Sequence, residues 1–356
     1  MARRHAGAKE LDGIIADLRR TYGQEGRLGF GGEVLDKERL EVVPSGLVTL
    51  DWELFRWGGP PLGRLLEISG RPGACKSLLG YYYLREAQRL WPDRLVAVLD
   101  TEGNLNWHGQ QWMEFNGVDM ACVVVGDWNR LEAMWETVVK FVRSGRFSVV
   151  MVDSLANTKT LWADDADGGG KRGYGTKEPV AAHARVTQEA MKDVIPACME
   201  NRTLLIVVNQ MRAKIGVLFG RREDTPGGAA FHHGLHMQLE LSHRGDEKED
   251  DGTVSSRRIE AYLRKSKVCP SAKTTSVNHL VFPLDGRPVD QWAAWMSTAR
   301  RYGVLGQKGG GWYEWGGVSA QGPVAFREAL QAAQQEASFV NAIVAACQSM
   351  YMRPTE

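Results

Sequence analysis

The stretch that decides the fold is residues 65–90, LLEISGRPGACKSLLGYYYLREAQRL. A short apolar run, 65–69, leads through a glycine-containing turn into residues 76–90, which have the length and periodicity of a helix. The turn reads Gly70-Arg71-Pro72-Gly73-Ala74-Cys75-Lys76-Ser77. Backbone N–H groups in such a loop and the N-terminus of the following helix suit a phosphate group. We therefore expect these eight residues to bind a nucleotide, with Lys76 at the β- and γ-phosphates and the Ser77 hydroxyl on Mg²⁺.

The loop departs from the phosphate-loop pattern at one position, where Cys75 replaces the usual glycine. We expect the cysteine to be tolerated, because this position needs a small side chain more than a left-handed backbone. Taken alone, the loop sequence could also be a plain strand-to-helix turn that binds no phosphate. Asp153 ends a second apolar run, VVMVD, and Glu102 follows a third, LVAVLD, as a Mg²⁺-holding aspartate and a water-activating base would. A single carboxylate at a strand end is more often a helix cap or a surface residue, but all three features in this order favour nucleotide binding.

Further apolar runs alternate with helical stretches along the chain. Runs at 95–100, 149–153 and 204–208 are separated by helical patterns at 130–144 and 180–200, which predicts an α/β fold with a mainly parallel sheet. After residue 230, alternation with period two predicts antiparallel strands around a solvated acidic loop, DEKEDDG. A smaller terminal unit begins near 287 and ends in a helical run over 324–350. Its four tryptophans are interpreted as a small core, with a base-stacking platform as the alternative: Trp292, Trp295, Trp312 and Trp315.

An amphipathic helix is predicted over 8–22. Leu11, Ile14, Ile15 and Leu18 recur at three- and four-residue spacing, and Gly23 follows as a stop signal. The apolar stripe must be buried, either on the chain's own core or on a neighbouring subunit.

Composition sets the class of protein. The 356 residues suffice for two or three domains, and 43% hydrophobic and 24% charged residues exclude a disordered chain, a collagen or a coiled coil. No run of 18 apolar residues and no apolar signal segment occurs, so we expect no membrane span. Five widely spaced cysteines argue against disulfides or a cysteine zinc site and favour a reducing cytoplasm. A net charge of +1 means that nucleic acid could bind only at local basic patches.

Two such patches exist. Residues 211–222 hold four basic and no acidic residues, interleaved with apolar side chains that include Phe219, so this segment could neutralise phosphates while wedging between bases. Residues 168–175, GGGKRGYG, are basic, aromatic and rich in glycine. The alternatives are an ordinary basic surface loop for the first and an ordinary disordered loop for the second. His232, His233 and His236 are weaker candidates for a metal site.

Residues 209–228, NQMRAKIGVLFGRREDTPGG, resemble the second DNA-binding loop of the bacterial RecA recombinases. The likeness covers about 8–350 in register, through SGLVTLDWELFRWGGPPLGRLLEISG, LDTEGNLNW, FSVVMVDSLA, TLLIVVNQMR and GGGWYEWGG. The phosphate loop without its last glycine is more similar to the phage branch, such as the T-even phage recombinase.

The resemblance implies a RecA-like ATPase core over 34–286, an N-terminal helix within 1–33 that serves polymerisation, and a small C-terminal α+β domain over 287–356. It implies ATP and Mg²⁺ as cofactors, Asp153 as a metal ligand and Glu102 as the group that activates water. Gln210 would sense the γ-phosphate, while Lys265 and Lys267 would reach the ATP of the next subunit. Asn106 stands near the adenine position in place of an aspartate.

The DNA-binding segments implied by the resemblance are loops 164–178 and 211–227 and the helix between them. Their residues are Lys171, Arg172, Arg185, Gln188, Lys192, Arg212, Lys214, Phe219, Gly227 and Gly228. The chain departs from the family at Gly109, where a stacking tyrosine is usual and where Trp107 or His108 could supply a ring, and at Ala229, which replaces an asparagine. We also expect the family's acidic C-terminal tail to be absent, because the sequence ends in Arg353-Pro354-Thr355-Glu356.

The sequence thus predicts an ATP-dependent DNA recombinase of the bacterial or phage-infected cytoplasm. Its partners would be single- and double-stranded DNA, further copies of itself in a filament, and single-strand-binding or mediator proteins. Two other functions stay open: a nucleotide-gated, DNA-coating filament with little hydrolysis, and a ring helicase on the same core.

Overall fold

A computed structural model describes residues 8–22, 41–160, 180–213, 223–268, 276–284, 291–306 and 309–349. The chain divides into two compact units, Met1–Glu41 and Val42–Glu356. The predicted N-terminal helix is confirmed as α1 (Ala8–Tyr22), which lies in the first unit. Its apolar side chains Leu11, Ile14 and Leu18 are exposed. Across the ranges given above, no helix is both long and apolar enough to cross a bilayer.

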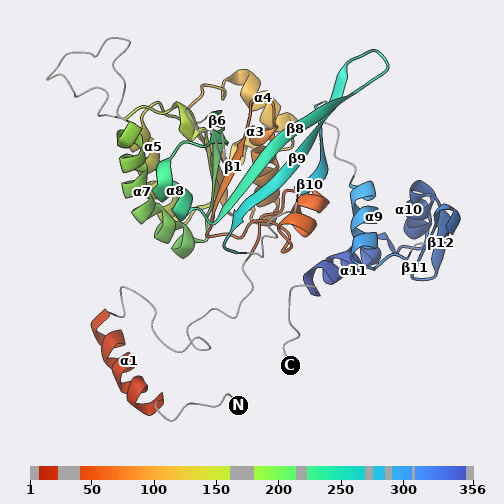
Figure 1. The fold of residues 1–356 in the computed structure, drawn as a ribbon, viewed down its shortest axis with the longest axis horizontal. Coiled ribbons are helices and arrows are strands. Elements are labelled where there is room, and N and C mark those ends of the chain that lie inside the picture. Colours follow the sequence, from red (N-terminus) through yellow and green to blue (C-terminus); the bar gives the residue numbers. More distant parts are fainter. Residues whose placement is uncertain are drawn as a thin grey trace. The chain divides into compact units, whose positions relative to one another are not determined.

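The second unit is built on an eight-stranded sheet in the order β10-β9-β8-β1-β5-β4-β2-β3 (Figure 1). Six strands of this sheet run parallel, β8 and these five: β1 (Leu65–Gly70), β2 (Leu95–Asp100), β3 (Val123–Asp127), β4 (Phe147–Asp153) and β5 (Leu204–Gln210). β8 (Met237–Lys248) pairs in parallel with β1 and antiparallel with β9 (Val254–Ser266), which pairs with β10 (Ser276–Pro283). The predicted α/β fold is confirmed, but the sequence reading missed two strands of this sheet, β3 and β10. β3 lacks a continuous apolar signal because it is short and only partly buried.

Helices cover both faces of this sheet. On one face, α3 (Lys76–Leu90) packs Leu79 and Tyr83 into a core with Ile68 of β1 and Met151 of β4. On the other face, α5 (Leu131–Arg143) and α7 (Val180–Asn201) enclose a second core around Trp135. Figure 1 shows α5, α7 and the short α8 (Gly228–Gly234) gathered on that side. Strands β1, β2, β4 and β5 are therefore buried on both faces, which explains their continuous apolar runs.

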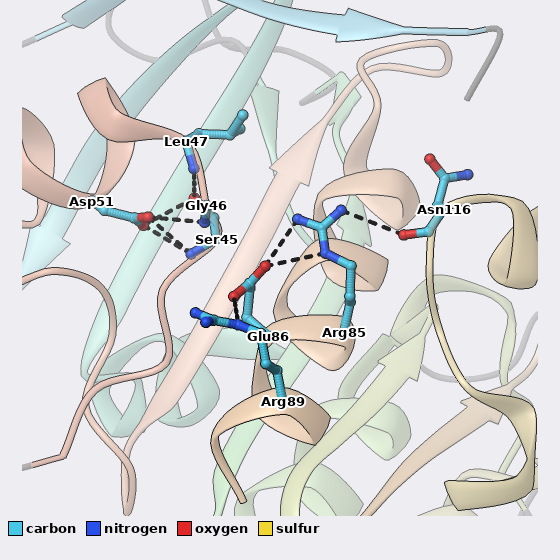
Figure 2. Close-up of polar contacts among 8 residues, drawn as sticks. All are labelled: Ser45, Gly46, Leu47, Asp51, Arg85, Glu86, Arg89 and Asn116. Carbon is cyan, nitrogen blue, oxygen red and sulfur yellow. Dashed lines mark hydrogen bonds and ion pairs between the residues drawn. The ribbon is translucent and has the colours of Figure 1, made fainter. Parts of the chain in front are cut away.

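A buried acidic residue ties the segment before β1 into a tight turn beside α3 (Figure 2). Asp51 accepts hydrogen bonds from the Ser45 N–H at 2.9 Å, the Ser45 hydroxyl at 2.9 Å and the Gly46 N–H at 2.9 Å. Burial raises the pKa of Asp51 to about 8, and the nearby charge of Glu86 adds to that rise, whereas the hydrogen bonds from Ser45 and Gly46 oppose it. On α3, Glu86 pairs with Arg85 at 3.1 Å. The turn at Ser45 and Gly46 thus lies beside α3, the helix that follows the phosphate loop (Figure 2).

The C-terminal part is a small α+β arrangement, as predicted. Its elements are α9 (Trp292–Arg301), β11 (Trp312–Trp315), β12 (Val318–Gln321), α10 (Pro323–Ala332) and α11 (Glu336–Ser349). Trp292 is buried in the core of this part, with Trp295 and Trp315 packed against it, whereas Trp312 is exposed.

The single helical run predicted over 324–350 is wrong. It breaks between α10 and α11, where Gln334 adopts a left-handed backbone with φ 57°. The break folds the two helices onto each other, so that the Phe326 and Phe339 rings meet edge to face at 5.7 Å. Aromatic burial of this kind outweighs the helical tendency of the connecting residues.

Candidate functional site

The phosphate loop lies between β1 and α3, where the sequence places it. Cys75 caps α3 with φ 56° and ψ 31°, a left-handed conformation. The expectation that this position does not need a left-handed backbone is therefore wrong. A side chain with a Cβ is strained there, and this is the physical reason why glycine suits the position.

Lys76, Ser77 and Asp153 meet at the start of α3. The Ser77 hydroxyl donates to Asp153 Oδ2 at 2.5 Å, and Lys76 Nζ donates to the Arg71 carbonyl at 3.1 Å. Burial raises the pKa of Asp153 to about 6, with the Ser77 hydrogen bond opposing that rise. Burial also lowers the pKa of Lys76, while Asp153 and Glu102 oppose the shift.

The Ser77–Asp153 pair suits Mg²⁺, which takes oxygen ligands and commonly binds through one or two protein groups together with phosphates and waters. Within the part of the chain that the structure describes, no group of three or more His, Cys, Asp or Glu side chains could hold a metal ion by itself. His236 instead accepts a hydrogen bond from the Leu65 N–H at 3.2 Å. A metal at Ser77 and Asp153 would accordingly take its remaining ligands from water and from the phosphates of a bound nucleotide.

Glu102 lies in the turn after β2 and is held there by two neighbouring strand ends. Its Oε1 accepts the Ser154 hydroxyl at 2.6 Å and the Gln210 amide at 2.8 Å. β2, β4 and β5 are adjacent parallel strands, and the pairing of Asp100 with Asp153 brings their carboxyl ends together. Of the three candidate catalytic residues, Lys76, Glu102 and Gln210, the last two are in direct contact although they lie 108 positions apart in sequence.

Sequence reasoning missed two residues that hold this turn in place, Asp100 at the end of β2 and Ser154 directly after β4. Asp100, almost fully buried, accepts hydrogen bonds from the N–H groups of Glu102 at 2.8 Å and Leu105 at 2.6 Å, which shapes the turn. Ser154 holds the Glu102 carboxylate. Both residues adjoin positions that the motifs had singled out, so a carboxylate ending one strand and a hydroxyl following another were the available signals.

Asn106 is the N-cap of α4 (Trp107–Phe115). Its side-chain oxygen accepts the N–H of His108 at 2.9 Å and of Gly109 at 3.2 Å. Trp107 beside it is 68% exposed and its ring meets the His108 ring edge to face at 5.0 Å. An adenine contact of Asn106 would have to use its amide nitrogen, and that role stays a prediction.

Lys265 and Lys267 lie away from the phosphate loop of their own chain. Lys265 pairs with Gln238 near the beginning of β8, whereas the loop follows the end of β1. Their ammonium groups donate to the His233 carbonyl, Lys265 at 3.2 Å and Lys267 at 2.6 Å. This is the C-terminal end of α8, where a positive charge is favourable.

The candidate DNA segments are described in part. Lys171, Arg172, Lys214 and Phe219, as well as the side chain of Arg212, lie outside the described residues. The backbone of β6 (Arg212–Ala213) pairs antiparallel with β7 (Glu223–Asp224), which closes the base of segment 211–227.

Gly227 and Gly228 connect that segment to α8 with φ values of 118° and 77°. A Cβ on Gly227 would lie 2.5 Å from the Phe231 ring, and one on Gly228 would lie 2.7 Å from the Ala184 Cβ of α7. The close approach to Ala184 brings the end of segment 211–227 beside the first turns of α7, which follows segment 164–178.

Helix α7 presents Arg185, Gln188 and Lys192 on one exposed face, at spacings of three and four residues. Lys192 forms an ion pair with Glu189 at 2.8 Å. The three candidate residues therefore face solvent on the helix that adjoins the base of segment 211–227.

A buried polar network fixes that base to the sheet. Asn209 donates to Glu67 Oε1 at 2.8 Å and to the Pro226 carbonyl at 3.1 Å. Gln238 donates to the other Glu67 oxygen at 3.0 Å, and His232 contacts the Thr225 carbonyl at 3.2 Å. Gln210, the residue after Asn209, contacts Glu102, so the two sites join at the end of β5.

The family model for the RecA N-terminal domain matches residues 9–283. The chain is 28% identical to protein RecA of Syntrophus aciditrophicus over 87% of this chain and 84% of that one. It is 28% identical to protein RecA of Macrococcus caseolyticus over 87% and 82%, and 27% identical to that of Ruminococcus albus over 86% and 72% of the two chains. The matched residues include the phosphate loop, Glu102, Asp153 and Gln210, and the chain belongs to the RecA family of ATP-dependent DNA recombinases.

Proposed function

We propose that this protein assembles as a filament on single-stranded DNA, with ATP between adjacent subunits, and pairs that strand with a homologous duplex. The observation that supports this best is the 2.8 Å hydrogen bond between Gln210 and Glu102. It joins the group that would activate water to the residue at which segment 211–227 begins. A change at the γ-phosphate would therefore reach the DNA segment through one side chain.

The chemistry needs mainly positioning and charge. The N–H groups of the phosphate loop and Lys76 would hold the β- and γ-phosphates, and Ser77 and Asp153 would hold Mg²⁺. The metal would neutralise charge that develops on the phosphate oxygens. Glu102 would orient the attacking water and accept its proton, with Ser154 and Gln210 keeping the carboxylate in place.

Lys265 and Lys267 lie at the opposite end of the sheet from the phosphate loop. This placement suits a contact with the ATP of a neighbouring subunit, because the lysines are not near their own. The exposed apolar residues of α1, Leu11 and Ile14, suit a subunit contact as well. Assembly would then depend on bound nucleotide.

Several finer points belong to the same proposal. The domain limits are 1–33, 34–286 and 287–356, and the chain belongs to the phage branch of the family. The protein acts in the cytoplasm of a bacterium or a phage-infected host, together with single-strand-binding or mediator proteins.

A second function, a DNA-coating filament with little hydrolysis, is favoured by one observation. Cys75 strains the phosphate loop in a left-handed backbone, which could slow turnover without preventing nucleotide binding.

Strand exchange between a circular single strand and its homologous linear duplex tests the proposal, alongside DNA-stimulated phosphate release. We expect both activities in the parent protein with ATP and Mg²⁺, and neither in Lys76→Ala, which lacks the cation for the phosphates. Filaments without phosphate release would favour the coating function. Rings in electron micrographs would contradict the filament.

A further inference from the structure

Arg257 of β9 reaches the phosphate loop of its own chain. Its Nη1 donates to the carbonyl oxygen of Gly73 at 3.3 Å, across 184 residues of sequence. Arg257 pairs with Asp246 of β8 on one side and with Phe282 of β10 on the other. It lies on the same face of the sheet as Ile259, two residues further along the strand, and Ile259 belongs to the core beneath α3.

The Arg257 guanidinium forms an ion pair with the carboxylate of Asp246. Asp246 Oδ1 lies 3.5 Å from Arg257 Nε and 2.7 Å from His243 Nε2. The Arg257 side chain is 35% exposed, yet its Nε is buried and has no hydrogen-bond partner among the described residues. The arginine is thus anchored by charge at one end while its other end meets the loop.

The same guanidinium adjoins Cys75. Burial raises the pKa of the Cys75 thiol to about 11, and the charge and hydrogen bonding of Arg257 act against that rise. Cys75 is the strained, left-handed residue of the loop, and Gly73 precedes it by two positions. Arg257 therefore contacts the part of the loop whose backbone is least favourable.

We propose that Arg257 is a positioning residue of the phosphate loop that raises nucleotide affinity in the subunit to which it belongs. The peptide group between Gly73 and Ala74 is held at both ends, because its carbonyl accepts from Arg257 at 3.3 Å and its N–H donates to the Arg71 carbonyl at 3.3 Å. The contact also restrains the loop in the conformation that surrounds phosphate, which lowers the ordering needed on binding. The positive charge adds to that of Lys76 in a site that receives several negative charges. This inference rests on the proposed nucleotide site.

Two substitutions and one matched control test the role. Arg257→Gln removes the charge, and Arg257→Lys keeps it. Arg258→Gln changes the adjacent residue, whose exposed side chain points to the opposite face of the strand. Binding of ADP and ATP with Mg²⁺ is measured by calorimetry on the full chain, and steady-state phosphate release gives KM and kcat.

We expect Arg257→Gln to weaken binding and raise KM about tenfold, the size of effect expected for one charge-assisted hydrogen bond. The kcat at saturating ATP should change by less than about threefold, because the reacting groups are untouched. Arg257→Lys should recover most of the affinity, and Arg258→Gln should bind like the parent. Alkylation of Cys75, followed by mass spectrometry of its peptide, should slow in Arg257→Gln because its thiol pKa rises further.

Parent-like nucleotide affinity in Arg257→Gln would overturn the inference, and so would a fall in kcat with KM unchanged. If Arg257→Gln does not fold, Arg257→Lys and Asp246→Asn decide: Asp246→Asn loosens the anchor and should weaken binding, and parent-like affinity in that variant overturns the inference. A parent protein that binds no ATP would refute the proposed function itself. A parent that binds ATP as tightly as Arg257→Gln leaves that function intact and removes only the role of Arg257.

Discussion

Gly227→Ala should damage the base of the candidate DNA segment by an amount that follows from its geometry. The residue has φ 118° and ψ −20°, and an added Cβ would lie 2.5 Å from Phe231 Cδ1 and 2.8 Å from its Cγ. Carbon atoms in contact normally stand about 3.5–4.0 Å apart, so the fully buried ring would have to move by about 1 Å. Backbone strain of about 2 kcal/mol and overpacking of about 2 kcal/mol, less about 0.5 kcal/mol for a stiffer unfolded chain, give a net loss of about 3.5 kcal/mol.

The matched control is Gly252→Ala, in the turn between β8 and β9. Its φ is 86°, but nothing lies within 4 Å of an added Cβ, so only backbone strain of about 1–2 kcal/mol applies. Urea unfolding of the full chain measures the two losses, and fluorescence anisotropy measures single-stranded DNA binding. We expect Gly227→Ala also to weaken DNA binding about tenfold, which corresponds to 1.4 kcal/mol. Equal losses of stability in the two variants, with DNA affinity intact in both, would refute the steric reasoning.

Four further outcomes are expected. Glu102→Gln should bind ATP and DNA but lose phosphate release by at least about a hundredfold, since an amide cannot accept the proton from water; release at the parent rate would place the base elsewhere. Cys75→Gly relieves about 1–2 kcal/mol of left-handed strain and loses about 1 kcal/mol of burial, so unfolding free energy and phosphate release should change little; phosphate release seen only in this variant would favour the coating function. Arg212→Ala and Lys214→Ala should each weaken single-stranded DNA binding for every sequence tested and flatten its log–log salt dependence by roughly 0.7; an unchanged slope with loss for one sequence alone would mean that they read bases. Because the folded-state pKa of Asp51 is raised to about 8 from 3.8, its contribution to stability is lost as pH rises from about 4 to 8, by at most about 1.4 kcal/mol per pH unit; thermal unfolding of the parent should show this fall, and Asp51→Asn should lack it.

Much of the core could be predicted because its signals are local. A buried parallel strand must be continuously apolar, so the runs that became β1, β2, β4 and β5 were recognisable, each to within two residues at either end. A phosphate loop must join a strand to a helix within a few residues, so its position was recognisable as well. The break between α10 and α11 was not, because the packing of Phe326 on Phe339 decides it.

The candidate site also combines residues that local sequence patterns predict with contacts that depend on strand order. Sequence alone was enough to predict Lys76, Ser77, Glu102 and Asp153 as site residues, since each ends a strand, follows one or opens a helix. The hydrogen bond from Gln210 to Glu102 could not be read from the sequence, because it depends on the order in which β2, β4 and β5 lie side by side.

The contact of Arg257 with Gly73 and the left-handed backbone of Cys75 were likewise decided by the folded chain. Periodicity and motif spacing report the neighbours of a residue along one strand or helix. The order of strands in the sheet decides which distant strand ends meet. The position of β9 beside the phosphate loop decides that the Arg257 guanidinium contacts the loop. Those two arrangements depend on the whole chain at once, and no local stretch of sequence contains them.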